Sequence, residues 1–150
     1  MIKESLCNRV YFSALLPEAC PVTYKGLVEV LDRHGVPHSL LEGTRDIWCR
    51  DYMPVQMTDH EFVSFDYHPD YLLDTPAHRR SISDGYAVAK ANGFDYVHDR
   101  RDIKIDGGNT VHSGMKLILT SKVFEENPGI PYDHLCQSLR MSLGAEPVFI

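Results

Sequence analysis

The chain has 150 residues, a length typical of a single domain, and it carries a formal net charge of -6. Hydrophobic residues make up 43% and charged residues 24% of the sequence, which excludes an intrinsically disordered chain. The negative charge argues against nucleic acid or an anionic membrane as a partner, and no apolar run reaches the ~20 residues that a membrane-spanning helix needs.

The first half of the chain predicts a strand, a helix, a second strand, a polar loop and a hairpin, in that order. Apolar residues at helical spacing indicate the helix, and Gly35 stands at the position of its C-terminal cap. Pro17 closes the first strand. We expect these elements at 9–16 (strand), 22–34 (helix), 38–42 (strand), 43–54 (loop) and 55–57 with 61–65 (hairpin).

The second half begins with a polar excursion that is rich in Pro, Asp, His and Tyr. A helix, short strands and a last helix follow. We expect these elements at 66–80 (excursion), 81–92 (helix), 94–97 and 103–105 (strands), 110–112 with 117–120 (hairpin), 132–143 (helix) and 146–150 (start of a strand). Within the excursion, Tyr67, His68, Asp70 and Tyr71 suit either a lid over a site or a solvated connection.

The order of elements repeats along the chain. One unit covers roughly 9–66, a second covers about 81–120, and a third begins near 131. Structural repeats normally come in closed or capped sets. We therefore expect a single incomplete α/β domain, 1–150, with about two units and the opening of a third.

The predicted loop at 43–54 contains side chains suited to a flat cation. They are Asp46, Trp48, Arg50 and Asp51. A carboxylate accepts two parallel hydrogen bonds from a guanidinium group, and an indole face adds a cation–π attraction of ~1–2 kcal/mol. The same residues would also suit a surface turn with a core Trp and an Arg–Asp ion pair.

A second polar segment joins the strands expected at 103–105 and 110–112. It reads Asp106, Gly107, Gly108 and Asn109. Two glycines after an acid let the backbone approach another group closely, although the same dipeptides also suit a tight hairpin turn. This segment and the first cluster fall at matching positions of the two repeated units, each after a strand.

Together the two segments resemble motifs of the agmatine deiminase and bacterial peptidylarginine deiminase family, members of the guanidine-modifying pentein superfamily. The family's Asp-x-Trp-x-Arg-Asp motif is matched by Asp46, Trp48, Arg50 and Asp51. Its Glu-Gly-Gly-Asn motif is matched by 106–109, with Asp in place of Glu. The stretch 117–128 is also similar to the family's strand-to-Asn-x-Pro segment.

The resemblance implies a five-bladed α/β propeller, of which this chain would form part, and hydrolysis of a guanidinium C–N bond. A Cys would attack the guanidinium carbon and a His would transfer protons, with no metal or other cofactor. Asp51 and Asp106 would hold the guanidinium nitrogens as the catalytic acids. The residues that would bind or support the substrate are Trp48, Arg50, Asp46, Gly107, Gly108 and Asn109.

The sequence departs from the family pattern at three points. Asp106 is one methylene shorter than the family's Glu. No His-x-Asp follows the second motif, since the one such triplet, 68–70, lies upstream of it, and no glycine run precedes a cysteine. We therefore expect the N-terminal part of a pentein, such as a truncated product, which holds half of the substrate cage without nucleophile or base.

Two other functions fit the same residues. Cys49 could act as the nucleophile of a Cys/His hydrolase with His112 as its partner. Alternatively, the chain could be a non-catalytic α/β binding module, in which Asp51, Asp106 and Trp48 capture a cationic ligand without reacting.

The cysteines and the repeat order lead to expectations about location and assembly. None of the four cysteines forms a Cys-x-x-Cys pair, so neither a zinc ribbon nor a redox pair is indicated. Reduced thiols in a cytoplasm are the simpler interpretation. A partial propeller leaves an apolar face exposed, which favours a homo-oligomer. The expected partner is a small cationic guanidinium substrate.

Overall fold

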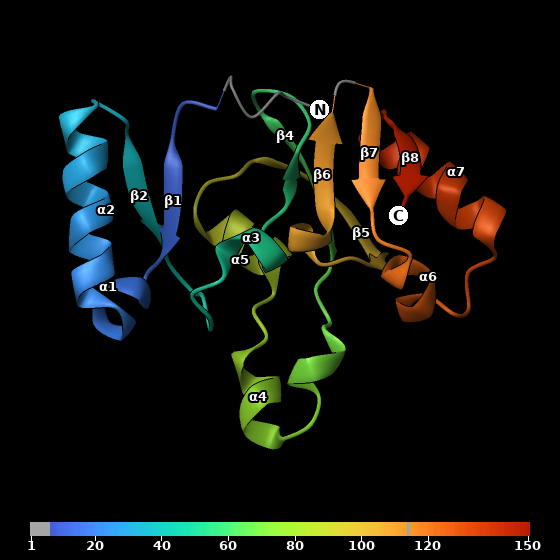
Figure 1. Ribbon diagram of the computed structural model, residues 1–150, viewed down its shortest axis with the longest axis horizontal. Helices are drawn as coiled ribbons and strands as arrows, with labels where there is room; N and C mark the ends of the chain where they lie inside the picture. Colours follow the sequence, from blue (N-terminus) through green and yellow to red (C-terminus); the bar gives the residue numbers. More distant parts are fainter. Residues whose placement is uncertain (1–6, 114) are drawn as a thin grey trace.

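The computed structural model describes residues 7–113 and 115–150 and shows a mixed α/β architecture. Residues 1–6, at the start of the chain, lie outside the described part. Three small sheets, one with two strands and two with three strands, stand side by side in chain order (Figure 1). The α/β class that the sequence predicts is therefore confirmed.

The first sheet is built around a helical crossover. Its two strands are parallel, with Val10 opposite His38 and Ser13 opposite Leu41. The predicted helix is confirmed to within one residue at each end. The elements are β1 (Val10–Ser13), α1 (Leu16–Ala19), α2 (Pro21–Arg33) and β2 (His38–Leu41).

The predicted strand at 9–16 is too long. It ends at Ser13, and the chain turns directly into α1, where Pro17 occupies the first turn. Proline has no N–H to donate, and the first helical turn needs none. Pro17 therefore sits inside a short helix instead of closing a strand.

The second sheet contains the predicted hairpin and one long strand. Its middle strand pairs antiparallel with the first and parallel with the third. The third strand is separated from the hairpin by a polar excursion and a helix. The elements are β3 (Val55–Gln56), β4 (Glu61–Asp66), η2 (Asp70–Leu72), α4 (Pro76–Ser81), α5 (Gly85–Ala91) and β5 (Tyr96–Lys104).

The strands predicted at 94–97 and 103–105 form the single strand β5. The charged stretch between them, which suggested a break, stays extended on the open edge of the sheet. Residues two apart lie on the same face of a strand, and here they form Arg–Asp pairs with N–O distances of 2.8–2.9 Å. These pairs satisfy the charges without interrupting the strand.

The segment between β4 and β5 differs from the prediction in two ways. Its predicted excursion contains short helices, and the predicted helix after it begins later. The excursion contains η2 and α4, which form an arm that projects from the body (Figure 1). Helix α5 begins at Gly85, four residues after the predicted start at Ser81. Asp84 caps it by accepting a hydrogen bond of 3.0 Å from the Ala87 N–H, which sets the first turn.

The third sheet repeats the order of the second, with a hairpin, a helix and a parallel strand. Both the hairpin and the last helix are confirmed, and the final strand pairs with the second strand of the hairpin. A short helix within the predicted connection was not expected. The elements are β6 (Thr110–Ser113), β7 (Lys116–Leu119), α6 (Lys122–Glu126), α7 (Tyr132–Leu143) and β8 (Glu146–Phe149).

The strand pairing divides the chain at different places from the predicted units 9–66 and 81–120. The hairpin of β3 and β4 belongs to the sheet of β5, not to that of β1 and β2. Because α5 is the crossover between the parallel strands β4 and β5, the structural unit begins with its hairpin. The first sheet has the crossover and its two parallel strands without such a hairpin among the described residues.

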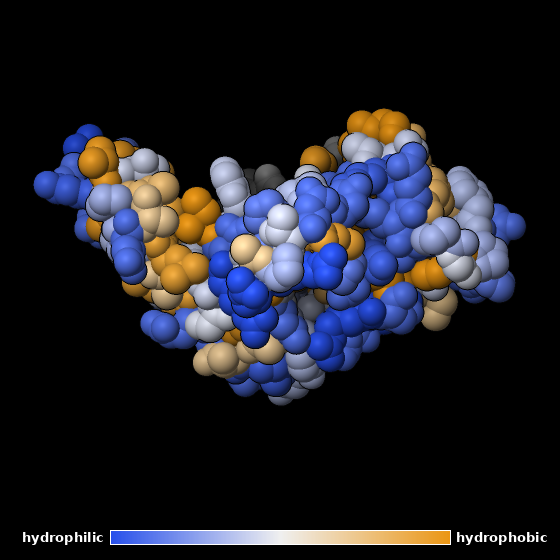
Figure 2. Space-filling model, turned by 90° about the horizontal axis from the view of Figure 1, so that it is seen from below, coloured by the Kyte–Doolittle hydropathy of each residue, from blue (hydrophilic) through white to orange (hydrophobic). Residues whose placement is uncertain are grey.

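The hydrophobic core lies between the second sheet, the third sheet and the helices α6 and α7. Eleven buried residues form it, including Leu135, Leu139 and Leu143 of α7. Neither α1 nor α2 has a buried residue, and Figure 2 shows apolar surface over the side that they occupy. No helix in 7–113 or 115–150 has the length and apolar character needed to cross a membrane.

Candidate functional site

The two sequence motifs meet in the structure at two short helical turns. The segment predicted as a loop at 43–54 contains the helical turn α3 (Cys49–Tyr52), which begins directly after Trp48. The second motif forms the 3-10 turn η3 (Gly107–Asn109), which follows Asp106. The turns α3 and η3 lie against each other although about 55 residues separate them in the chain.

The paired glycines allow this contact. A Cβ on Gly107 would overlap the backbone carbonyl oxygen of Arg50, and a Cβ on Gly108 would overlap Oδ1 of Asp51. The sequence predicted a close approach at these glycines, and the group that approaches is the other motif. Because Gly107 and Gly108 have no side chains, Asp51 can lie next to the turn that follows Asp106.

The carboxyl group of Asp51 lies in a partly buried and negatively charged place. Burial and the nearby charge of Asp46 raise its pKa, while a hydrogen bond from the Gly108 backbone N–H and the charge of Arg50 lower it. The net shift is upward. The Gly108 N–H and Arg50 therefore offset the effects of burial and of Asp46 on the Asp51 carboxylate only in part. A bound cation would stabilise its charge further.

Asp106 lies in a similar environment with a larger shift. Burial, followed by the charge of Glu126, raises the pKa of Asp106 to about 6. Asp51 and Asp70 contribute to this rise, and Lys122 opposes it. The charge of Asp51 thus reaches Asp106, as expected for two acids on one site.

Tyr67 lies within electrostatic reach of both acids. It is buried, its ring centroid lies 5.9 Å from that of Tyr52 in α3, and its hydroxyl lies 3.4 Å from that of Tyr71. Burial and the Tyr71 hydroxyl raise the pKa of Tyr67, and both Asp51 and Asp106 add to this rise. The charges of both carboxyl groups therefore act on the same phenol.

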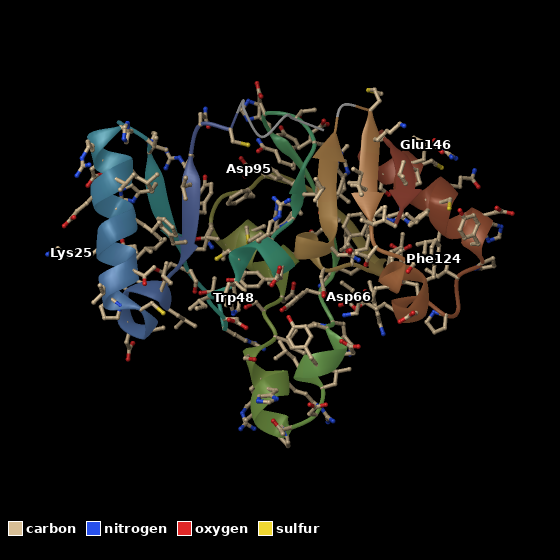
Figure 3. The ribbon with its side chains drawn as sticks, viewed as in Figure 1. Lys25, Trp48, Asp66, Asp95, Phe124 and Glu146 are labelled. Carbon is tan, nitrogen blue, oxygen red and sulfur yellow. The ribbon has the colours of Figure 1, made fainter. Side chains whose placement is uncertain are left out.

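Trp48 and Asp46 take different positions around α3. The indole of Trp48 is 64% exposed (Figure 3), so the alternative of a core tryptophan is wrong. Its ring is available to a ligand from solvent. The backbone carbonyl of Asp46 accepts a hydrogen bond of 2.9 Å from the Tyr52 hydroxyl, which fixes the start of the turn.

Arg50 and Asn109 attach the two turns to the third sheet. Arg50 donates from Nη2 to the backbone carbonyl of Thr110 at 3.0 Å, which ties α3 to the first residue of β6. Oδ1 of Asn109 accepts from the Thr120 N–H at 2.9 Å, just after β7. Both side chains therefore hold the contact between the turns in place.

Sequence reasoning missed several residues of this region. Lys122 and Glu126 of α6 lie near Asp106, and Gly85 packs against the Tyr52 carbonyl so closely that a Cβ would overlap it. The four-residue spacing of Lys122 and Glu126 was a readable signal for an ion pair on a helix. Gly85 had no such signal, because its neighbour comes from a distant part of the chain.

A cavity of about 460 Å³ is lined in part by residues of α3 and η3. Cys49, Arg50 and His112 line it together with apolar residues of β1 and β4, whereas neither Asp51 nor Asp106 does. Burial raises the pKa of Cys49, although the Tyr52 hydroxyl at 3.2 Å acts in the opposite direction. A raised pKa keeps Cys49 as a thiol at neutral pH, which is unfavourable for a nucleophile. Across residues 7–113 and 115–150, no group of three or more His, Cys, Asp or Glu side chains could hold a metal ion.

The raised pKa of Asp106 has a measurable effect on stability. Between about pH 4 and pH 6 an unfolded Asp releases its proton while Asp106 in the fold retains it, so the free energy of unfolding falls as the pH rises through this window. We expect Asp106→Asn to stabilise the fold by about 1–2 kcal/mol at pH 7, less than the full shift because the side chain is partly solvated. Urea unfolding should show this gain at pH 7 and none at pH 4, and an equal effect at both pH values would contradict it.

Comparison with solved structures identifies proteins that share the fold of this chain. No protein-family model and no curated protein matches the sequence. Agmatine deiminase of C. jejuni is 14% identical with a TM-score of 0.69, and the match covers 99% of this chain and 54% of that one. Agmatine deiminase of Enterococcus faecalis is 16% identical with a TM-score of 0.54, over 94% of this chain and 39% of that one.

A third solved structure, of a candidate peptidyl-arginine deiminase, is 20% identical with a TM-score of 0.56. The match covers 77% of this chain and 36% of that one. The chain thus spans between 36% and 54% of the length of these three proteins. It has the fold of a part of the agmatine and peptidyl-arginine deiminases.

Proposed function

We propose that the chain is the N-terminal part of a guanidine deiminase. The reaction is hydrolysis of a guanidinium C–N bond in agmatine, arginine or peptidyl-arginine, with a ureido product and ammonia. The observation that carries the proposal is the contact of α3 with η3 through Gly107 and Gly108, together with the action of the charges of Asp51 and Asp106 on Tyr67. The fold shared with deiminase structures supports it.

In this proposal, the two acids bind the guanidinium group. Each carboxylate can accept hydrogen bonds from two guanidinium nitrogens, which fixes the plane of the cation. A bound cation lowers the pKa of both acids and so favours the ionised form of Asp106 even near pH 6. The exposed indole of Trp48 can cover the ligand, while Arg50, Asn109 and the glycines hold the two turns together.

The covalent steps need groups that this sequence does not provide in the family's positions. A Cys thiolate adds to the guanidinium carbon, ammonia leaves with a proton from a His, and water then displaces the thiolate to give the ureido product. In our proposal this Cys and His belong to a longer protein that includes further units. Those units would complete a propeller, to which the three sheets contribute as the first units of one domain.

The proposal is tested by the complete product of the reading frame. We expect sequence to continue beyond Ile150 and to supply a His-x-Asp and a Cys after a glycine run. The complete protein should release ammonia from agmatine, arginine or N-acetyl-arginine amide, and the 150-residue chain alone should release none. Turnover by the 150 residues alone, or a stop codon directly after Ile150, would overturn this proposal.

A binding module is the second candidate, because this chain contains both acids and its elements α3 and η3 are in contact. Calorimetry with arginine and agmatine separates the two functions. A binding module takes up the ligand as 150 residues, and Asp51→Asn abolishes the heat of binding. An incomplete propeller gives no heat of binding at the same concentrations.

A Cys/His hydrolase is a third candidate, supported by the common cavity of Cys49 and His112. The raised pKa of Cys49 is unfavourable for it. If it were correct, Cys49→Ser would abolish hydrolysis by the complete protein. Unchanged hydrolysis in that variant would eliminate it.

Location and assembly form the last part of the proposal. We place the protein in the cytoplasm, where its cysteines would stay reduced. Copies would associate through the apolar surface over α1 and α2, where Val22 is 86% exposed and Val30 is 51% exposed (Figure 2). Sedimentation of the purified chain at several concentrations measures this association.

A further inference from the structure

Lys122 is placed among acidic and aromatic groups beside the candidate site. Its Nζ lies 3.1 Å from Oε1 of Glu126 and 3.1 Å from Oδ1 of Asp70. The same ammonium lies 5.9 Å from the centroid of the Tyr71 ring, within the range of a cation–π contact. One side chain of α6 therefore joins its own helix to the excursion after β4.

This ion pair differs from an ordinary surface pair. The side chain of Glu126 is only 9% exposed and that of Lys122 is 35% exposed. Burial disfavours the charged form of Lys122, but its hydrogen bond to Asp70 and its ion pair with Glu126 outweigh this and raise its pKa. Since a buried carboxylate without a partner is strongly unfavourable, Lys122 stays charged at neutral pH.

The groups that act on Asp106 come from three elements. Glu126 and Lys122 lie on α6, Asp51 lies on α3, and Asp70 lies on η2. The charge of Asp106 also raises the pKa of Tyr67, which precedes η2. Among the charged groups that act on Asp106 in this set, the ammonium of Lys122 is opposed by three carboxylates.

We propose that Lys122 is a positioning residue for Asp106: it docks the Asp70–Leu72 turn against α6 and supplies the positive charge that lets Asp106 present an ionised carboxylate to a cation. The role of this charge in cation binding rests on the proposed guanidinium function. The docking of the turn depends on the contacts of Lys122 alone. Docking also keeps Tyr71 against Lys122 and Tyr67 beside the two acids.

The charge of Lys122 affects the pH at which Asp106 loses its proton. Lys122 lowers the pKa of Asp106, so its removal raises that pKa above the present value of about 6. At pH 6–7 a larger fraction of Asp106 then carries a proton. Binding of a cation would weaken in this range and recover at higher pH.

The test is a titration of the Asp106 carboxyl carbon by NMR, without any ligand. We expect Lys122→Met to raise the pKa of Asp106 by about one unit and Lys122→Arg to restore it. Lys25→Met is the matched control, because Lys25 forms the same four-residue pair with Glu29 on the distant helix α2 (Figure 3). An unchanged titration of Asp106 in Lys122→Met would overturn the proposal.

A second variant separates docking from charge and avoids loss of the fold. Asp70 is exposed, so Asp70→Asn should fold normally. It removes the anchor of the turn but keeps Lys122 charged, so trypsin should cleave faster at Arg79 and Arg80 while the pKa of Asp106 falls. Equal cleavage in wild type and Asp70→Asn would contradict docking. Because neither measurement uses a guanidinium ligand, failure of the proposed function leaves both results interpretable.

Discussion

Replacing Gly107 with alanine should lower the free energy of unfolding by about 3 kcal/mol or more. The new methyl group would overlap the backbone carbonyl oxygen of Arg50, which cannot rotate away as a side chain can. Relief requires that α3 and η3 separate. Urea unfolding followed by circular dichroism measures the loss.

Two other glycines serve as controls for this prediction. Gly26 lies in α2 with open space around it, so Gly26→Ala should stabilise the fold by about 0.5–1 kcal/mol. Gly108→Ala meets the carboxylate of Asp51, which can turn aside, and so should cost less than Gly107→Ala. If Gly107→Ala unfolds at the same urea concentration as wild type, the contact between the two turns is not as tight as the structure has it.

If the proposed function is correct, Asp51→Asn and Asp106→Asn in the complete protein should each lower kcat/KM by about 100- to 1,000-fold. An amide has the shape of the carboxylate but lacks its charge, and it presents N–H groups to a cation that is itself a donor. The loss should be similar for agmatine and for arginine, because both acids would face the guanidinium group that the two substrates share. Steady-state ammonia release measures it.

Matched variants give this prediction its controls. Asp95→Asn removes an exposed carboxylate outside the group of charges around Asp51 and Asp106 and should leave kcat/KM unchanged (Figure 3). Asp106→Glu introduces the residue of the family motif and should keep most of the activity. If Asp51→Asn and Asp95→Asn have the same activity, Asp51 does not hold the substrate.

Local signals in the sequence predicted much of the fold. The helices α2 and α7 are each followed by a glycine with positive φ, at Gly35 and Gly144, and both were predicted closely. The predictions failed where a residue's local preference gave way to pairing elsewhere. The charges of β5 suggested a break, although neighbouring arginines and aspartates neutralise one another along the extended strand.

The candidate site could be predicted in part. The pattern of Asp, Trp and Arg indicated Asp51, and the glycine pair after Asp106 indicated a close approach. The sequence did not indicate that the two motifs contact each other, because η3 and α3 meet only in the folded chain. Lys122 was missed although its spacing from Glu126 indicated an ion pair, because its other partner, Asp70, lies 52 residues away.

The uneven placement of the core has a consequence for how the fold opens. The buried leucines of α7 join the second and third sheets, whereas α2 covers its strands without a buried residue. Regions with little buried apolar area open at lower free energy than the global fold. The segment from β1 to β2 should therefore exchange its amide hydrogens earlier than the two sheets that α7 joins.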